Sequence, residues 1–264
     1  MEINRNLKYL LIIAMILTVY SLSSCQKDDS VAEYNRPVVE GYLIPGQALQ
    51  LKVYYQKYLT DTISYGYPIT GLAIRVSDGT NNFLLTESKP GVYDYSDVNF
   101  IKENKSYALN FTYLDKVISA QTVIPSKPLN FKASATTQEV PAFTPGTSTT
   151  FVPVTYNWSN PNLGYYLMAF QSIDPYPSNI SRNTRLKTEV LVDQVSYYNT
   201  EQMTFNYSGN YKVILFHINK EYSDALKSTG GNSLNLTNPS TNIVNGLGIF
   251  TGLTADTLDV FVYQ

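Results

Sequence analysis

Short segments in which apolar and polar residues alternate recur along most of the chain. In Leu49–Tyr55, the side chains of Leu49, Leu51, Val53 and Tyr55 would share one face of an extended backbone, and the same period of two returns in Tyr107–Tyr113. This period is typical of strands that bury one face. About seven such segments, separated by turn residues, precede residue 125, which favours strands paired into an antiparallel sandwich.

We therefore predict an all-β fold made of two antiparallel β-sandwich domains of immunoglobulin or fibronectin III type. Pro125-Ser126-Lys127-Pro128 interrupts the alternating pattern, so we place an N-terminal sandwich at residues 37–126 and a second one at residues 127–264. In the second, an alternating segment ends at Trp158 and leads into Asn160-Pro161. This pattern resembles the early strands of fibronectin III-like sandwiches, in which the Trp is a core residue.

One short helix is expected in the second domain, over Asn219–Ser228. Asn219 can cap its first turn, and Gly230-Gly231 stops it. Further on, Gly246 and Gly248 begin like a dinucleotide fingerprint, but Thr251 occupies the place of the third glycine. We interpret these glycines as a tight backbone crossing before a final strand that carries Leu258, Val260 and Val262.

The first 24 residues have the features of a secretory signal peptide. Arg5 and Lys8 form a short basic region, and Leu11–Val19 is an apolar run too short to span a bilayer. The sequence Leu22, Ser23, Ser24, Cys25 then resembles a bacterial lipobox, in which the Cys becomes the acylated N-terminus. An ordinary secretory signal followed by a chance Cys is the alternative.

Residues 25–36 are expected to carry the acylated Cys25 and a tether. Two or three acyl chains anchor a protein stably where one does not, because each buried CH₂ contributes ~0.8 kcal/mol. The four residues after Cys25 are Gln26, Lys27, Asp28 and Asp29. A Lys followed by acidic residues resembles the surface-export signal of Bacteroidetes lipoproteins, although a solvated charged linker would look the same.

The usual chemical motifs are missing from the sequence. Cys25 is the only Cys and His217 the only His, so a disulfide framework, a zinc site or a Ser-His-Asp triad has too few residues. His217 is best explained as a structural or surface residue of a strand. Asp78-Gly79 is interpreted as a hairpin turn. We expect no catalytic residues, no metal and no cofactor, and thus no enzyme.

The charge balance argues against a nucleic-acid partner, because the formal net charge is −2 and there is no basic block.

The chain is rich in tyrosine, with 23 residues of this type. Exposed aromatic rings can stack on sugars or anchor a protein partner. Tyr58, Tyr65 and Tyr67, in the long loop 56–71, are therefore our first candidates for ligand binding, and the loop Asp174–Arg185 is the second. The alternative is that most tyrosines pack on the faces of the sandwiches.

Taken in order, several segments of the mature chain resemble the Bacteroidetes lipoprotein family named domain of unknown function 4249. The matching segments are P-V-V-E-G-Y-L at Pro37–Leu43, A-I-R-V-S-D-G at Ala73–Gly79, G-V-Y at Gly91–Tyr93 and N-G-L-G-I-F at Asn245–Phe250. The resemblance implies an outer-membrane or surface lipoprotein, often encoded beside a TonB-dependent transporter. It implies no reaction and no catalytic residues.

From these features we expect a lipid-anchored outer-membrane protein that faces the extracellular side. Its expected role is that of a non-catalytic accessory, or ligand-binding partner, of a TonB-dependent transporter in nutrient uptake. The alternative is a structural or adhesive surface protein, such as a pilus component or adhesin, and an enzyme is the third possibility.

Overall fold

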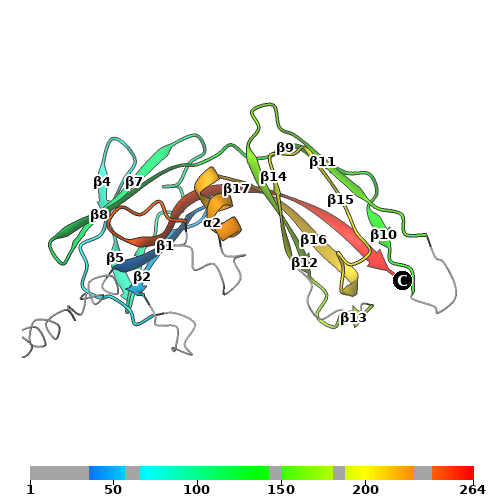
Figure 1. The fold of residues 1–264 in the computed structure, drawn as a ribbon, viewed down its shortest axis with the longest axis horizontal. Helices are drawn as coiled ribbons and strands as arrows, with labels where there is room; N and C mark the ends of the chain where they lie inside the picture. The colour runs from blue at the N-terminus through cyan, green and yellow to red at the C-terminus, as the bar shows by residue number, and fades with distance from the viewer. Residues whose placement is uncertain (1–35, 57–65, 143–149, 181–187, 229–239) are drawn as a thin grey trace, which may run out of the picture. The chain divides into compact units, whose positions relative to one another are not determined.

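The fold is seen in a computed structural model, which describes residues 36–56, 66–142, 150–180, 188–228 and 240–264. Residues 36–264 form one compact unit. The described residues are mostly β-strand, with one short helix, α2 (Lys220–Ser228), as the sequence predicts (Figure 1). The strands are β1 (Pro37–Leu43), β2 (Leu49–Tyr55), β3 (Arg75–Ser77), β4 (Asn82–Leu84), β5 (Thr86–Lys89), β6 (Val92–Tyr95), β7 (Ser106–Tyr113), β8 (Lys116–Val123), β9 (Leu129–Ala133), β10 (Thr137–Glu139), β11 (Thr155–Ser159), β12 (Tyr165–Ser172), β13 (Ser178–Asn179), β14 (Glu189–Asp193), β15 (Tyr197–Asn199), β16 (Tyr207–Ile218) and β17 (Leu247–Tyr263).

The described strands pair into three sheets. The largest has the order β14-β12-β16-β17-β1-β2-β6-β5, with β10 added to β17 and β13 added to β16. The second sheet has the order β4-β3-β7-β8, and the third β15-β11-β9. The predicted Asp78-Gly79 turn is confirmed, because it joins β3 to β4 with Ser77 opposite Asn82.

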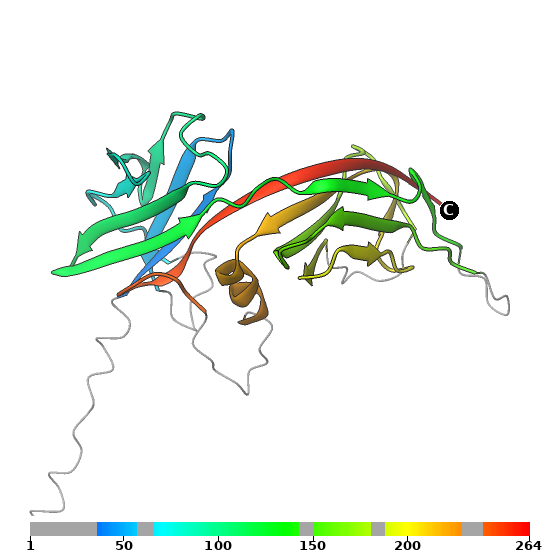
Figure 2. The same ribbon diagram turned by 90° about the horizontal axis from the view of Figure 1, so that it is seen from above.

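Strand β17 is the element that holds the largest sheet together. Its first six residues pair in parallel with β1, Val38 lying opposite Leu247, and its later residues pair antiparallel with β16 (Figure 2). Its last three residues pair in parallel with β10. The prediction of only antiparallel pairing and of a separate final strand after Gly248 was therefore wrong. The chain returns beside its own first strand, and no proline interrupts the seventeen residues of β17.

The first hydrophobic core lies between β1, β2 and β6 of the large sheet and β3, β7 and β8 of the second sheet. Leu49, Leu51 and Val53 are fully buried in it, as their alternation predicts. Ile243 and Phe250 belong to the same core, although they lie well beyond residue 126 in sequence. They reach it because the start of β17 lies beside β1.

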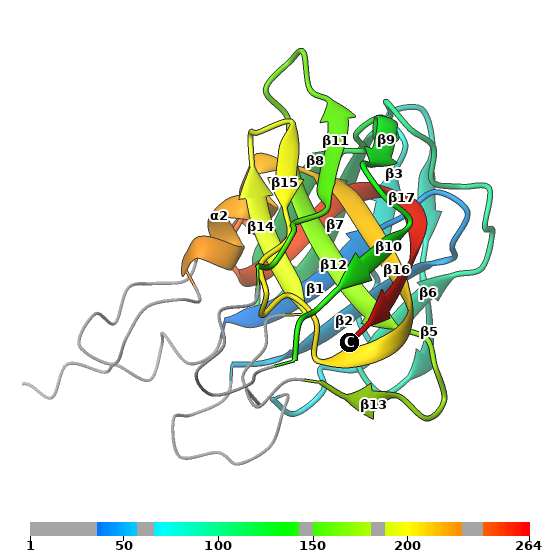
Figure 3. The ribbon, with the colours of Figure 1, turned by 90° about the vertical axis from the view of Figure 1, so that its right-hand side faces the viewer.

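The second core lies between the third sheet and β12, β16 and β17 of the large sheet (Figure 3). Trp158 is buried in it, as expected. Aromatic rings meet edge to face along this core; those of Phe170 and Phe205 lie 5.5 Å apart and those of Phe205 and Tyr211 lie 5.0 Å apart. A fully buried side chain of this size contributes about 2–3 kcal/mol through the apolar surface it removes from water.

Polar contacts bind the segment between the two cores to β16 and β17. The carbonyl of Ser126 accepts hydrogen bonds from His217 Nδ1 at 2.8 Å and Thr254 Oγ1 at 2.9 Å. The next residue, Lys127, forms an ion pair with Asp256 at 3.1 Å. The Pro125–Pro128 segment, predicted as a domain boundary, is thus tied to the last strands of the chain.

Helix α2 begins one residue later than predicted, and Asn219 lies just before it. The Asn219 carbonyl accepts the first backbone hydrogen bonds of the helix, from Tyr222 and Ser223. Its side-chain amide points elsewhere: it donates to Thr122 Oγ1 at 2.9 Å and to the Val123 carbonyl at 2.7 Å. Asn219 therefore links the helix to β8, in addition to its expected place at the helix start.

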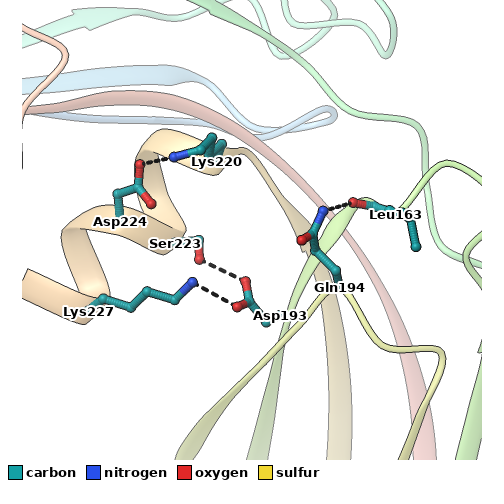
Figure 4. Close-up of polar contacts among 7 residues, drawn as sticks. All are labelled: Leu163, Asp193, Gln194, Lys220, Ser223, Asp224 and Lys227. Carbon is teal, nitrogen blue, oxygen red and sulfur yellow. Dashed lines mark hydrogen bonds and ion pairs between the residues drawn. The ribbon is translucent and has the colours of Figure 1, made fainter.

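Another part of the helix is held to the end of β14. Asp193 accepts from Ser223 Oγ at 3.1 Å and pairs with Lys227 Nζ at 2.7 Å (Figure 4). In the same view, Gln194 donates to the carbonyl of Leu163 at 2.6 Å. Among the residues that the structure describes, no helix has the length and apolar character needed to cross a bilayer.

Candidate binding site

A group of exposed aromatic side chains lies at the end of β17. Along the last residues of this strand, Val262 points into the second core, whereas Phe261 and Tyr263 point outward and are exposed. The two outward rings are stacked, with centroids 6.4 Å apart and planes 18° from parallel. Pairing with β10 holds this end of the strand in place.

The loop after β12 approaches the same place. Its first residue, Asp174, accepts hydrogen bonds from the backbone and side-chain amides of Asn210, the latter at 3.2 Å. Gly209 has a φ of +118°, and a Cβ there would collide with the Asp174 carboxylate, so only glycine suits this close approach. The carboxylate of Asp174 thus fixes the loop to β16 through its hydrogen bonds with Asn210. Tyr176, two residues on, is 92% exposed.

Strand β13 completes this end of the loop by pairing with the beginning of β16, where Ser178 lies opposite Ser208. The hydroxyl of Tyr211 bonds both the amide and the carbonyl of Tyr207, which stiffens the start of β16. Burial raises the pKa of Tyr211, so its hydroxyl keeps its proton and remains able to donate. The polar side chains beside the aromatic rings, such as those of Ser178 and Ser208, therefore extend from a backbone that is fixed by hydrogen bonds.

These elements line an open, shallow hollow of about 450 Å³. It is lined by Asp174, Tyr176, Ser178, Asn179, Ile180, Ser208, Gly209, Phe261, Val262, Tyr263 and Gln264. The ionisable carboxylate among these side chains, that of Asp174, is already hydrogen-bonded to Asn210. The other side chains present aromatic faces next to neutral hydroxyl and amide groups, and the Asp174 carboxylate disfavours an anionic ligand, so the hollow suits a neutral ligand that has a flat apolar face.

The loop that the sequence ranked second, Asp174–Arg185, therefore contributes to a hollow with residues 174–180; its later part lies outside the described residues. The sequence did not single out Phe261 and Tyr263. Their signal was present, because they occupy the polar face of a strand whose other face carries Val260 and Val262. Two aromatic residues on an outward face are worth noting in any final strand.

The structure describes only part of loop 56–71, our first candidate for ligand binding from the sequence. Tyr58 and Tyr65 lie outside the described residues. Tyr67 is 75% exposed, and its carbonyl accepts from the Tyr55 amide at 2.8 Å. It lies at the end of β2 and does not line the hollow described above. The signal and anchor residues Leu22, Ser23, Ser24, Cys25, Gln26, Lys27, Asp28 and Asp29 also lie outside the described residues.

Two residues considered for chemistry have structural partners. Hydrogen bonds from the backbone amides of Asn81 and Thr80 hold the pKa of the Asp78 carboxyl below its ordinary value, as in a tight polar turn. His217 stacks on Tyr166 at 4.7 Å between ring centroids. In the described part of the chain, no three His, Cys, Asp or Glu side chains gather as metal ligands would.

The comparison with known families agrees with the motifs noted in the sequence. The profile of the family described as domain of unknown function, DUF4249, matches residues 27–259. The chain belongs to this family. As the description says, membership of DUF4249 assigns no function.

Other comparisons add little. None of the curated proteins matches the chain. Among solved structures, the FN1–FN3 domains of chicken CNTN1 align with 87% of this chain and 68% of their own, at 10% identity and a TM-score of 0.28. A TM-score this low does not establish a shared fold.

Proposed function

We infer that this DUF4249 protein is a lipid-anchored protein of the outer membrane, exposed at the cell surface, which binds a ligand and serves a TonB-dependent transporter as a non-catalytic accessory in nutrient uptake. The lipobox-like sequence ending at Cys25 and the Lys-Asp-Asp after it support the anchor and the address. The observation that carries the binding role is the aromatic hollow formed by Tyr176, Phe261 and Tyr263.

The course of β17 supports this role. Its first residues pair with β1, the strand that follows the tether in sequence, and its last residues line the hollow. Val262 lies twelve positions after Phe250, which corresponds to about 40 Å along an extended strand. A protein anchored before β1 would thus present its binding site well away from that strand.

For the fold itself we propose two sandwiches of fibronectin III type that share β17. The two separate hydrophobic cores support this description, since each lies between a part of the large sheet and one smaller sheet. The sequence boundary near residue 126 would then separate them, except for residues 240–252, which accompany the first core through Ile243 and Phe250.

The proposed partner is tested by isolating the tagged, acylated protein from its native membranes in mild detergent and identifying the co-purified proteins by mass spectrometry. A stoichiometric TonB-dependent receptor is the expected result. Recovery of the protein alone, or as a ladder of its own oligomers, would overturn the transporter role and favour the structural or adhesive alternative.

The proposed site is tested separately, on an array of neutral oligosaccharides. Tyr176→Ala should lower binding at least tenfold without changing the melting temperature, because its ring is exposed and packs on little else. Tyr197→Ala is the matched control: Tyr197 is an exposed tyrosine on β15 that does not line the hollow. Equal loss in both variants, or in neither, would contradict the site.

A further inference from the structure

A second exposed apolar surface lies at the other end of β17, around the tip of the hairpin formed by β7 and β8. It consists of Tyr55, Tyr67, Tyr113, Leu114, Val117 and Val244, and we name it the hairpin-tip surface. All of these except the half-buried Tyr113 are exposed. None of them lines the aromatic hollow.

The three tyrosines of this surface contact one another or lie side by side. The ring of Tyr55, at the end of β2, lies edge to face against that of Tyr113, at the end of β7, with centroids 6.4 Å apart. Burial, together with a hydrogen bond to Tyr55, raises the pKa of Tyr113 to about 12. Tyr67 is held beside Tyr55 by the backbone hydrogen bond between them.

The remaining residues of the hairpin-tip surface, Val117 and Val244, are connected by hydrogen bonds along β8. Val244 and Ser119 exchange two backbone hydrogen bonds, of 2.8 and 3.4 Å. The side chain of Asn245 donates to the carbonyl of Val117 at 2.9 Å. Val117 and Val244 therefore lie on the outer face of the second sheet, whereas Tyr113 lies on its inner, core-facing side, so the two groups of side chains meet only around the hairpin tip.

Leu114 is the most unusual residue of the hairpin-tip surface. It forms, with Asp115, a two-residue turn between the paired residues Tyr113 and Lys116. Both turn residues have positive φ, 45° for Leu114 and 60° for Asp115. Such a turn favours Asn or Gly, and a leucine there is strained. Its side chain is 63% exposed, so neither the turn nor the core explains an apolar residue at this position.

The surface lies next to the point where the tether joins the fold. Tyr55 is paired with Pro37, the first residue of β1. Pro37 lies twelve positions after Cys25, so the segment between them spans at most about 40 Å when fully extended. An anchor at Cys25 would therefore keep the hairpin-tip surface within reach of the bilayer that holds the acyl chains.

We propose that the hairpin-tip surface docks on the lipid bilayer, with Leu114 entering the interfacial region and the tyrosine rings lying at the level of the headgroups. This proposal rests on the lipid anchor inferred above. Tyrosine suits this position because its ring is apolar and its hydroxyl polar. The exposed side chains of Asp115, in the turn itself, and of Lys116, next to it, can remain in water among the headgroups.

The test uses the fact that Cys25 is the only cysteine and is blocked once acylated. Leu114→Cys then provides a single thiol for a nitroxide spin label in the full acylated protein, placed in vesicles of phosphatidylethanolamine and phosphatidylglycerol. Leu163→Cys is the matched control, since Leu163 is also 63% exposed and also has a positive φ, of 52°. Accessibility to oxygen and to a water-soluble nickel chelate is measured for each label.

At position 114 we expect the ratio of oxygen to nickel accessibility to be at least threefold that at position 163. Equal ratios, with both proteins floating with the vesicles, would overturn the docking proposal and leave the anchor intact. A label at 114 that is protected in native membranes but not in these vesicles would likewise overturn it, in favour of a protein partner. Acylated protein that does not float would overturn the anchor and the docking together.

Discussion

The side-chain amide of Asn245 donates a hydrogen bond of 2.9 Å to the backbone carbonyl of Val117, on the free edge of β8. The next carbonyls on this edge are occupied in the same way. Ser119 accepts from the Val244 amide at 2.8 Å, Gln121 from Asn242 at 3.4 Å and Val123 from Asn219 at 2.7 Å. Three asparagine side chains and one backbone amide thus cover an edge that would otherwise offer carbonyls to another strand.

Removing this cover should promote self-association. The double variant Asn242→Ala, Asn245→Gly frees the carbonyls of Gln121 and Val117, and glycine tolerates the φ of +57° at position 245. We expect its weight-average sedimentation coefficient to rise with protein concentration more steeply than that of the unaltered chain. The expected loss of stability is about 2–3 kcal/mol, because Asn242 also bonds the backbone of Phe250.

Asn199→Ala serves as the control, since it removes an exposed side-chain hydrogen bond to Thr155 without opening the β8 edge. If the double variant is destabilised but sediments like the control, the asparagines are needed only for folding. That outcome would also mean that the asparagine side chains are not what prevents other strands from adding to the edge of β8.

The parallel pairing of β1 with β17 should depend on Gly248. This residue has a φ of +96°, and a Cβ there would collide with the backbone carbonyl of Val39. Gly248→Ala should cost about 3 kcal/mol or more in the free energy of urea unfolding, from backbone strain and the collision together. Gly46→Ala isolates the first effect: its φ is +82°, but nothing lies within 4 Å of the added Cβ, so we expect about 1 kcal/mol. Equal losses would show that the collision relaxes at little cost.

The contrast between local and distant features explains what could be predicted from the sequence. The strand Leu49–Tyr55, the turn at Asp78 and the helix after Asn219 follow from short-range patterns, and they appear as expected. The pairing of Val38 with Leu247 joins residues far apart in the chain, and no periodicity indicates which strands will be neighbours. The shared strand β17 was therefore missed.

The same reasoning applies to the candidate site. A long polar loop after β12 was recognisable as a place for binding, and so was Tyr67 in the loop after β2. Nothing in the order of residues brings Tyr176 to Phe261 and Tyr263. They line the same hollow because β13 pairs with the start of β16, whose next neighbour is the end of β17. An assembled site of this kind requires the sheet order.

The strained turn at Leu114 leads to a prediction about stability. Leu114→Asn should raise the free energy of unfolding by about 0.5–1 kcal/mol, because asparagine adopts the positive φ of 45° more readily and little apolar contact is lost. Val117→Asn, at an exposed position in the neighbouring strand, should instead lower stability slightly. The measurement is urea unfolding of both variants. A loss of stability in Leu114→Asn would mean that the leucine side chain packs usefully in the folded protein.

The partial burial of His217 makes stability depend on pH. A carbonyl can only accept, so Nδ1 of His217 carries the hydrogen that it shares with Ser126 at 2.8 Å. Burial lowers the pKa of His217 below its usual 6.5, an effect only partly offset by this hydrogen bond. The unfolded chain therefore binds a proton at a higher pH than the folded chain. The stabilisation is complete above about pH 6.5, and it is lost as the pH falls from there through the folded pKa.

The free energy of unfolding should thus decline between pH 7.5 and pH 5, a range in which most carboxylates remain ionised. His217 is the only histidine, so the slope can be assigned by one substitution. His217→Gln keeps an amide donor for the Ser126 carbonyl but has no titrating group, and its unfolding free energy should be nearly flat over this range. A slope that persists in His217→Gln would instead assign the pH dependence to groups other than His217. A flat profile in His217→Gln, beside a declining one in the unaltered chain, would show that the ring of His217 is buried as neutral imidazole between Tyr166 and the segment that joins the two cores.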